Sequence, residues 1–266
     1  MKVLVTGAAG SIGQVVTVGL ADRGHTVVGL DLVPQPDGGD GPWYTVDATD
    51  ADAVAAVFEE ETLDAVVHLA GHPDEGSLPD SLTSHVVTTA ALLDAMVEHD
   101  VRRIVYASSN HAVGRTPRSD LVGVDVRPRP DTFYGVAKVA AEAVLSLYAD
   151  RHDVDAVACR IGSFLDRPET VRHLSTWLSH DDCVRMVDAA LTATAPGFAV
   201  LYGISANTRA WWDLEAGRAL GYEPQDDAEA FADAIVPRPE DDAEGAHVGG
   251  PFATGGFERP ALDRSS

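Results

Sequence analysis

Two patterns of apolar residues alternate along the chain. Short apolar runs rich in Val, Ile and Leu are typical of strands buried on both faces of a parallel sheet, whereas longer stretches repeat apolar positions at helical spacing. Strands are expected at residues 2–6, 26–31, 43–46, 64–70, 102–108, 154–161 and 199–203. Helices are expected at residues 11–23, 51–58, 80–99, 132–150, 181–193 and 211–220. This alternation predicts an α/β fold in which helices cover both faces of a doubly wound parallel sheet.

The regular alternation loosens after residue 162. A polar loop that contains proline covers residues 163–173, and Pro, Gly and Asp dominate from residue 236 onward. Such compositions are typical of irregular structure. We therefore expect a main α/β unit at residues 1–162 and a smaller region at residues 163–266, whose tail is irregular and partly docked.

The composition is that of a globular protein with a sizeable core. Of the 266 residues, 45% are hydrophobic and 23% are charged, which fits one large domain with a modest addition. The two cysteines, Cys159 and Cys183, are too few for a disulfide framework. No apolar run approaches about 18 residues, and no charged leader precedes one, so we expect no membrane span, no signal peptide and a cytoplasmic location.

Acidic residues dominate the charge of the chain. There are 42 of them against 19 basic residues, for a net charge of −23, and only Lys2 and Lys138 are lysines. Without a basic stripe to neutralise phosphates, no binding of nucleic acid is expected. A dense carboxylate surface that is poor in lysine is typical of halophilic proteins.

We expect the melting temperature to rise between dilute buffer and molar salt. In dilute buffer the carboxylates repel one another unscreened, whereas at about 1 M salt the screening length falls to about 3 Å. Thermal unfolding at one pH and a series of KCl concentrations measures this effect. A melting temperature that stays level or falls would contradict it.

A glycine-rich turn joins the first expected strand to the first expected helix. Gly7 and Gly10 allow the backbone to turn tightly and to approach a pyrophosphate, and Gly13 allows the helix to pack on the strand. Ser11 and Ile12 lie in the first turn of that helix, where free N–H groups and the helix dipole attract an anion. Glycines in a turn can also serve only its geometry, but a strand before and a helix after are the context of a Rossmann-type dinucleotide site.

The cofactor expected in this site is NAD, with NADP less favoured. Asp31 ends the second strand, where a carboxylate can accept hydrogen bonds from the adenosine ribose and repel a 2′-phosphate. Leu32 and Val33 follow it, where an arginine would suit NADP. Asp47 is expected to lie near the adenine amino group.

A phenol and an ammonium lie four residues apart in the helix expected at residues 132–150. Tyr134 and Lys138 therefore share one face of it. Such a pair often lies on a solvated face, but here Ser108 and Ser109 follow the fifth strand, at the sheet edge where ligands of α/β folds bind. A phenol has a pKa of about 10, and a nearby ammonium lowers that pKa, so the pair can supply a general base. The serine hydroxyl can hold the reacting oxygen.

These features resemble the extended short-chain dehydrogenase/reductase superfamily, also described as NAD-dependent epimerases and dehydratases, over roughly residues 1–205. Further segments narrow the resemblance to the uronate dehydrogenases and related sugar C1-dehydrogenases, with a haloarchaeal character in the acidic surface. The matching segments are residues 108–114, 160–163, 174–182, 202–207, 211–213 and 220–222, with Pro224.

The resemblance implies oxidation of a sugar at its anomeric carbon, giving a lactone and NADH. Tyr134 would take the proton of the anomeric hydroxyl, and Lys138 would bind the nicotinamide ribose and lower the pKa of Tyr134. Ser109 would hold the reacting oxygen, with Asn110 and His111 lining the sugar site. In this reading residues 1–162 bind NAD and residues 163–266 form the substrate-binding region.

The resemblance also implies further cofactor contacts. Leu69, Ala70 and Gly71 follow the fourth strand, and Ile161 ends the sixth, so all four reach the carboxyl edge of the sheet. For the substrate, Ser163 and the arginine nine residues later correspond to the pair that grips the sugar carboxylate in uronate dehydrogenases.

That arginine, Arg172, suits a carboxylate because its planar fork can bind both oxygens. Arg172 could also be an ordinary surface cation. The chain departs from the family at His72-Pro73, where Ile-Ser is usual, and at His85, where asparagine is usual in the next helix. These departures leave room for a neutral aldose such as arabinose or galactose in place of a hexuronate.

Other functions remain open at this point. A sugar-phosphate dehydrogenase acting on glucose 6-phosphate would need a basic pocket, to which Arg115, Arg118 or Arg172 could contribute. A nucleotide-sugar epimerase or dehydratase shares the Ser–Tyr–Lys trio but usually has a larger C-terminal region, and a redox-sensing binding protein tends to lose the Tyr/Lys pair. No metal site is expected. Helices 80–99 and 132–150 could pair two copies of the chain.

Overall fold

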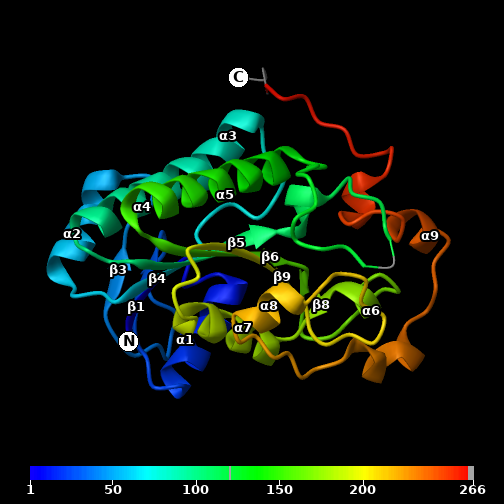
Figure 1. The fold of residues 1–266 in the computed structure, drawn as a ribbon, viewed down its shortest axis with the longest axis horizontal. Coiled ribbons are helices and arrows are strands. Elements are labelled where there is room, and N and C mark those ends of the chain that lie inside the picture. The colour runs from blue at the N-terminus through cyan, green and yellow to red at the C-terminus, as the bar shows by residue number, and fades with distance from the viewer. Residues whose placement is uncertain (120, 263–266) are drawn as a thin grey trace.

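The computed structural model describes residues 1–119 and 121–262, and its centre is a seven-stranded sheet (Figure 1). The strands lie in the order β3-β2-β1-β4-β5-β6-β9, and every neighbouring pair is parallel. They are β1 (Lys2–Thr6), β2 (Thr26–Asp31), β3 (Trp43–Thr45), β4 (Ala65–His68), β5 (Arg103–Ser109), β6 (Asp155–Ile161) and β9 (Phe198–Gly203). All seven expected strands are present.

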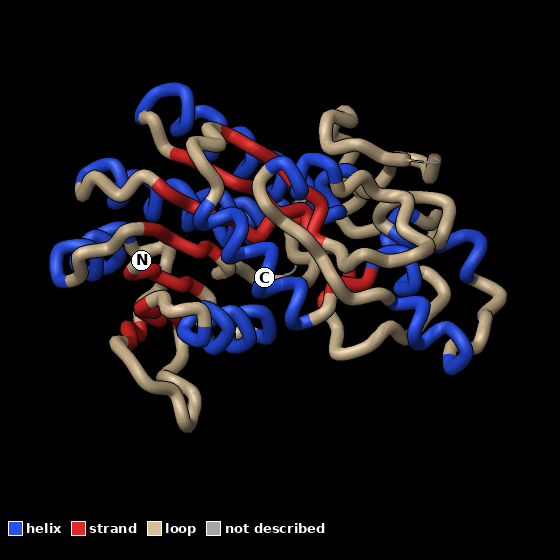
Figure 2. Tube along the Cα trace, turned by 60° about the horizontal axis from the view of Figure 1, so that its bottom comes forward, coloured by secondary structure: helices blue, strands red, loops and turns tan. Residues whose placement is uncertain are grey.

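Helices pack on both faces of this sheet (Figures 1 and 2). Helices α2, α4 and α5 bury apolar side chains on one face, and α1 and α7 do so on the other. The longer helices are α1 (Ser11–Asp22), α2 (Ala51–Glu60), α4 (Thr88–Glu98), α5 (Phe133–His152) and α7 (His180–Thr192). The shorter ones are α3 (Leu78–Leu82), α6 (His173–Thr176), α8 (Glu215–Ala219) and α9 (Asp241–Glu244). The doubly wound α/β fold predicted from the sequence is confirmed.

Two expected helices differ from the prediction. The helix expected at residues 80–99 is divided into α3 and α4 by a π-helical turn at Thr83–Val87. The helix expected at residues 211–220 was wrong in its first half, because only Glu215–Ala219 is helical. Trp211 and Trp212 are buried instead, and the Val122 N–H donates to the Trp211 carbonyl at 2.8 Å. Core packing of these two rings thus outweighs helical periodicity.

The C-terminal region extends the fold at the carboxyl edge of the sheet. Two short strands, β7 (Ser163–Phe164) and β8 (Trp177–Leu178), pair in a second, parallel sheet. The tail is docked at Val248, which is fully buried and donates its N–H to Thr116 at 3.0 Å. Ala253 in the same segment is also buried.

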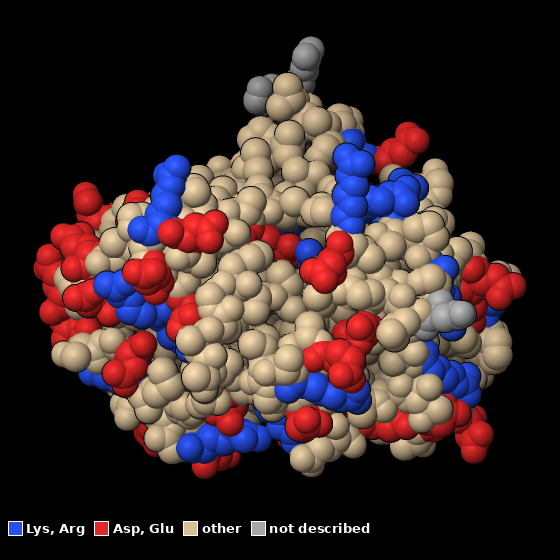
Figure 3. Space-filling view, viewed as in Figure 1, with Lys and Arg blue, Asp and Glu red and all other residues tan. Residues whose placement is uncertain are grey.

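Acidic residues are spread over much of the visible surface. Figure 3 shows red side chains gathered at the end of the molecule where α2 lies and scattered elsewhere, with blue ones between them. Among the described helices, none is both long enough and apolar enough to cross a bilayer.

Candidate active site

The glycine-rich turn lies in the crevice between the ends of β1 and β4, where the strand order reverses. Gly7 has φ +70, a left-handed conformation that favours glycine, and a Cβ on it would lie 2.7 Å from the Ala70 nitrogen. A Cβ on Gly13 would overlap the Gly7 carbonyl. Larger residues are therefore excluded at Gly7 and Gly13, so the backbone of the turn lies directly against the loop after β4.

Helix α1 begins at this turn with its N–H groups uncapped. Its N-cap residue is Gly10, and no side chain in the described part of the chain caps the helix. The first N–H groups, including those of Ser11 and Ile12, are thus available to an anion, and the helix dipole adds positive potential. The turn and the helix end fit the pyrophosphate of a dinucleotide.

Leu69, Ala70 and Gly71 form the opposite wall of the crevice. The Leu69 N–H donates to the Thr6 carbonyl at 3.1 Å, and the Ala70 N–H donates to Thr6 Oγ1 at 3.3 Å. These bonds fix the loop after β4 to the end of β1, which places the three predicted cofactor residues beside the glycine turn.

Asp31 lies at the end of β2 with its carboxylate held by backbone donors. Ala9 donates its N–H to Asp31 Oδ2 at 2.9 Å, and Val33 donates to Oδ1 at 3.3 Å. The carboxylate is therefore fixed next to the turn, as recognition of a ribose requires. Asp47 accepts hydrogen bonds from the N–H and hydroxyl of Thr49, which lower its pKa. Its adenine contact stays a prediction.

We expect Asp31→Asn to raise kcat/KM for NADP relative to NAD by about tenfold or more. Asparagine keeps an acceptor for the Ala9 N–H but removes the charge that repels a 2′-phosphate, a repulsion of about 1–4 kcal/mol for charges about 4 Å apart near a surface. Steady-state kinetics with both cofactors measure the ratio. The exposed Asp37→Asn is the control, and an unchanged ratio in Asp31→Asn would remove Asp31 from cofactor selection.

Tyr134 and Lys138 lie in the first turns of α5, beside the end of β5. Lys138 Nζ is 5.3 Å from the centroid of the Tyr134 ring and donates to the Ala107 carbonyl at 2.6 Å. Ser109 is buried at the last position of β5, where it pairs with Ile161 of β6. The trio expected from the sequence therefore converges at the carboxyl edge of the sheet.

The protonation of this trio is governed by burial. Burial raises the pKa of Tyr134 to about 12, and a hydrogen bond with Ser109 opposes the rise. Burial also lowers the pKa of Lys138 to about 7, against the attraction of Glu142. That Lys138 lowers the pKa of the phenol stays a prediction, and the opposing effect of burial could not be predicted, because spacing along a helix does not reveal desolvation.

A cavity of about 280 Å³ lies beside His111, whose ring packs against that of Tyr134. Its lining includes Asn110, His111, Ser163 and Arg172, all predicted to contact the sugar. The His111 ring lies 5.9 Å from the Tyr134 ring, which joins the cavity to the trio. The structure thus gathers four of the six predicted substrate residues in one pocket, whereas Ser109 and Tyr134 do not line it.

Arg172 enters this pocket as a half-buried cation. Its Nη2 donates to the Val248 carbonyl at 2.6 Å, and its Nη1 lies 3.4 Å from Ser163 Oγ and 3.3 Å from Thr176 Oγ1. Burial lowers its pKa to about 10, so it stays charged at neutral pH. Among the described residues, no carboxylate forms an ion pair with it, although Asp131 and Glu244 lie close enough for their charges to oppose the fall in its pKa.

His111 is oriented by a carboxylate that the sequence analysis missed. Its Nδ1 lies 2.9 Å from Oδ1 of Asp131, whose side chain is fully buried. A carboxylate at Nδ1 holds the proton there, so Nε2 is left to face the pocket. No local pattern marks Asp131, because its partner lies 20 residues earlier in another element.

The tail contributes other residues that the sequence did not indicate. Asn110 Nδ2 donates to the Val248 carbonyl at 3.1 Å, and Phe252 lies edge-on to His111 with centroids 4.9 Å apart. Arg238 and Glu244, which form an ion pair, also line the cavity. Gly249 and Gly250 are the only local signal that a tight turn occurs here.

The departures from the family lie outside this cavity. His85 is buried in the π-helical turn, where its Nε2 donates to the His72 carbonyl at 3.0 Å and its ring lies 5.1 Å from that of Tyr134. Burial and then Lys138 lower the pKa of His85 to about 3. His68 is fully buried on Thr6, as a structural histidine would be. Neither His72 nor His85 lines the sugar pocket.

Residues 1–119 and 121–262 contain no cluster of three or more His, Cys, Asp or Glu side chains arranged to hold a metal ion. The His180-Asp181-Asp182 segment opens α7, which Ser179 caps by accepting from the Asp182 N–H at 2.9 Å.

The fold, the glycine-rich turn and the convergence of Ser109, Tyr134 and Lys138 at one edge of the sheet are typical of dinucleotide-dependent α/β enzymes. The chain belongs to the NAD dependent epimerase/dehydratase family, whose family model matches residues 3–166. Together with the similarities below, this makes it an NAD-dependent oxidoreductase.

Similar proteins cover nearly the whole chain. A uronate dehydrogenase from Pseudomonas putida is 34% identical over 96% of this chain and 96% of its own length. A crystal structure of a tyrosine-to-alanine mutant of uronate dehydrogenase from Agrobacterium tumefaciens, complexed with NAD, is 36% identical with a TM-score of 0.88, and the match covers 98% of each chain. An L-arabinose 1-dehydrogenase from Haloferax volcanii is 34% identical over 85% of this chain and 97% of its own.

Proposed function

We propose that the protein oxidises the C1 hydroxyl of a hexuronate to the lactone, with NAD as the oxidant. The observation that carries the substrate class is Arg172, a half-buried cation that forms no ion pair within the described residues and lines the pocket beside His111. Withdrawing a cation from water is costly, and a substrate carboxylate would offset the part of that cost that Asp131 and Glu244 do not. The similarity to uronate dehydrogenases over the whole chain supports the same class.

The trio carries out the proton transfer, and the pocket residues orient the sugar. Tyr134 takes the proton of the C1 hydroxyl as the C1 hydrogen leaves with its electron pair, while Ser109 holds the reacting oxygen. Lys138 places its ammonium beside Tyr134 and the nicotinamide ribose. When bound, oxidised NAD supplies the hydride acceptor and a positive charge that favours the phenolate. His111 and Asn110 orient the ring hydroxyls.

The alternatives fit the pocket less well. Of the arginines expected to serve a phosphate, Arg115 donates to the Ala253 carbonyl at 3.0 Å and Arg118 lies over the Trp211 ring. Arg172 lines the sugar site together with Arg238, and Arg238 is already paired with Asp241 and Glu244. A neutral aldose would offer Arg172 no ion-pair partner. The small cavity and the tail that walls it favour a free sugar over a nucleotide sugar.

The proposal also covers the roles of the two regions of the chain, its location and the pairing of two copies. Residues 1–162 bind NAD, and residues 163–266 complete the substrate pocket through Ser163, Arg172 and the tail. The protein works in the cytoplasm. Exposed Val87 and Leu147 lie on the helices expected to pair two copies.

An assay of NAD reduction in molar salt tests the proposal. The sugars are galacturonate, glucuronate, arabinose, galactose and glucose 6-phosphate at matched concentration. The uronates should give the highest kcat/KM. Uronates that are inert while a neutral sugar reacts would overturn the substrate class, and no reaction with any sugar would overturn the activity.

A further inference from the structure

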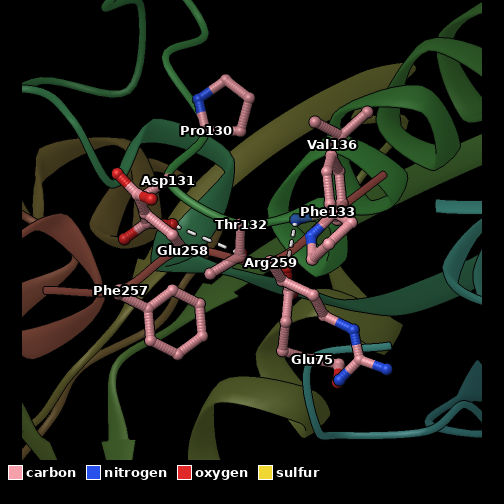
Figure 4. A pocket seen from close by; sticks show the side chains of 10 residues that line it. Glu75, Pro130, Asp131, Thr132, Phe133, Val136, Phe257, Glu258 and Arg259 are labelled. Atoms are coloured by element: carbon pink, nitrogen blue, oxygen red, sulfur yellow. Dashed lines mark hydrogen bonds between the residues drawn. The ribbon is translucent and has the colours of Figure 1, made fainter. Parts of the chain in front are cut away.

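Glu75 binds the backbone of the helix that carries Tyr134. Its Oε1 accepts the Phe133 N–H at 2.8 Å, and its Oε2 accepts the Tyr134 N–H at 3.0 Å. Figure 4 shows the side chain reaching the start of α5, with the bond from Phe133 drawn. Thr132 already caps the Gly135 N–H at 2.9 Å, so Glu75 satisfies the two donors of the first turn that Thr132 does not reach.

The loop that carries Glu75 begins at the predicted cofactor contacts. Gly71 has φ +148, and a Cβ on it would overlap the His85 ring. The His72 N–H donates to Ser84 Oγ at 2.7 Å, and the His72 carbonyl accepts from His85. The loop is thus fixed to the π-helical turn at one end and to α5 at the other.

The tail reaches the same point. Arg259 Nη1 donates to the Glu75 carbonyl at 3.2 Å, and the Leu78 N–H donates to the Ala261 carbonyl at 2.9 Å. Glu75 therefore lies where the cofactor loop, the catalytic helix and the tail meet. Its carboxylate is the direct link from that loop to the residue that bears the phenol.

We propose that Glu75 is a positioning residue that couples the loop after β4 to the placement of the Tyr134 phenol. The inference rests on the proposed role of Tyr134. A carboxylate that accepts the N–H groups of both Phe133 and Tyr134 holds the first turn of α5 at two points. The orientation of the Tyr134 phenol depends on the position of that turn. Misplacement of a reacting group by about 1 Å can cost on the order of 100-fold in rate.

Glu75 lines a cavity of about 660 Å³ beside the start of α5, and the exposed Glu258 lines the same cavity. The test compares Glu75→Ala and Glu75→Gln with Glu258→Gln. Glu75→Ala should lower kcat about 10- to 100-fold, with KM for the sugar and Kd for NADH within about threefold of the parent. Glu75→Gln keeps one acceptor oxygen, so its kcat should lie between that of the parent and that of Glu75→Ala. Glu258→Gln should match the parent.

NADH-binding stoichiometry gives the folded fraction, so that kcat refers to intact sites even where Glu75→Ala folds poorly. An unchanged kcat in both Glu75 variants, or a rise in KM and Kd with kcat retained, would overturn the inference. If Tyr134→Phe abolishes turnover while the Glu75 variants keep it, only the inference about Glu75 fails. If Tyr134→Phe is active, the proposed chemistry fails first.

Discussion

Tyr134→Phe should abolish measurable sugar oxidation while binding of NADH stays nearly intact. General acid–base groups contribute about 100- to 10,000-fold to rates, and phenylalanine lacks the hydroxyl that takes the proton. The ring still packs against His85 and His111, whose centroids lie 5.1 and 5.9 Å away, so the pocket keeps its shape. Turnover of galacturonate and titration of NADH fluorescence separate the two effects.

Tyr148→Phe is the matched control for this variant. Tyr148 lies on the same helix, α5, and its hydroxyl donates to Asp94, away from the cleft. It should keep the parent kcat. Retained activity in Tyr134→Phe would remove the phenol from the proton transfer, whatever the control shows.

Arg172→Met should lower kcat/KM for galacturonate by about 10- to 150-fold and leave galactose oxidation much less affected. Hydrogen bonds to a charged partner are worth about 1.5–3 kcal/mol, and Arg172 offers its charge to a carboxylate only when the substrate carries one. Methionine preserves much of the volume of the buried stem. Steady-state kinetics with both sugars give the ratio.

Arg167→Gln, an exposed arginine in the same loop, is the control. Because Arg172 also donates to Val248, the melting temperature of each variant is measured alongside. Equal losses of kcat/KM with galacturonate and galactose would show that Arg172 shapes the pocket and does not bind a carboxylate.

Local pattern predicts much of this fold. The apolar run at residues 2–6 and the glycines after it are sufficient for β1, the turn and α1, because strand burial and backbone conformation are encoded within a few residues. Tyr134 and Lys138 could likewise be paired from helical spacing alone. The helix expected at residues 211–220 failed where tertiary packing of Trp211 and Trp212 outweighed periodicity.

What the sequence did not reveal depends on contacts between distant segments. The Val248 carbonyl meets Asn110, 138 residues earlier, and Glu75 meets Phe133, 58 residues later. Neither contact leaves a local signature. The effect of burial on Tyr134 and Lys138 is also invisible to spacing, because desolvation depends on every element packed around the pair.

Oxidation of galacturonate labelled with deuterium at C1 tests the central claim most directly. Transfer of hydride from C1 predicts that the NADH formed carries the label, that the product is the lactone, and that kcat/KM shows a primary isotope effect where the chemical step limits it. Mass spectrometry of NADH and of the sugar product measures where the deuterium lies and which product forms. Steady-state rates with labelled and unlabelled galacturonate measure the isotope effect. Unlabelled NADH with the deuterium retained on the sugar would contradict the account.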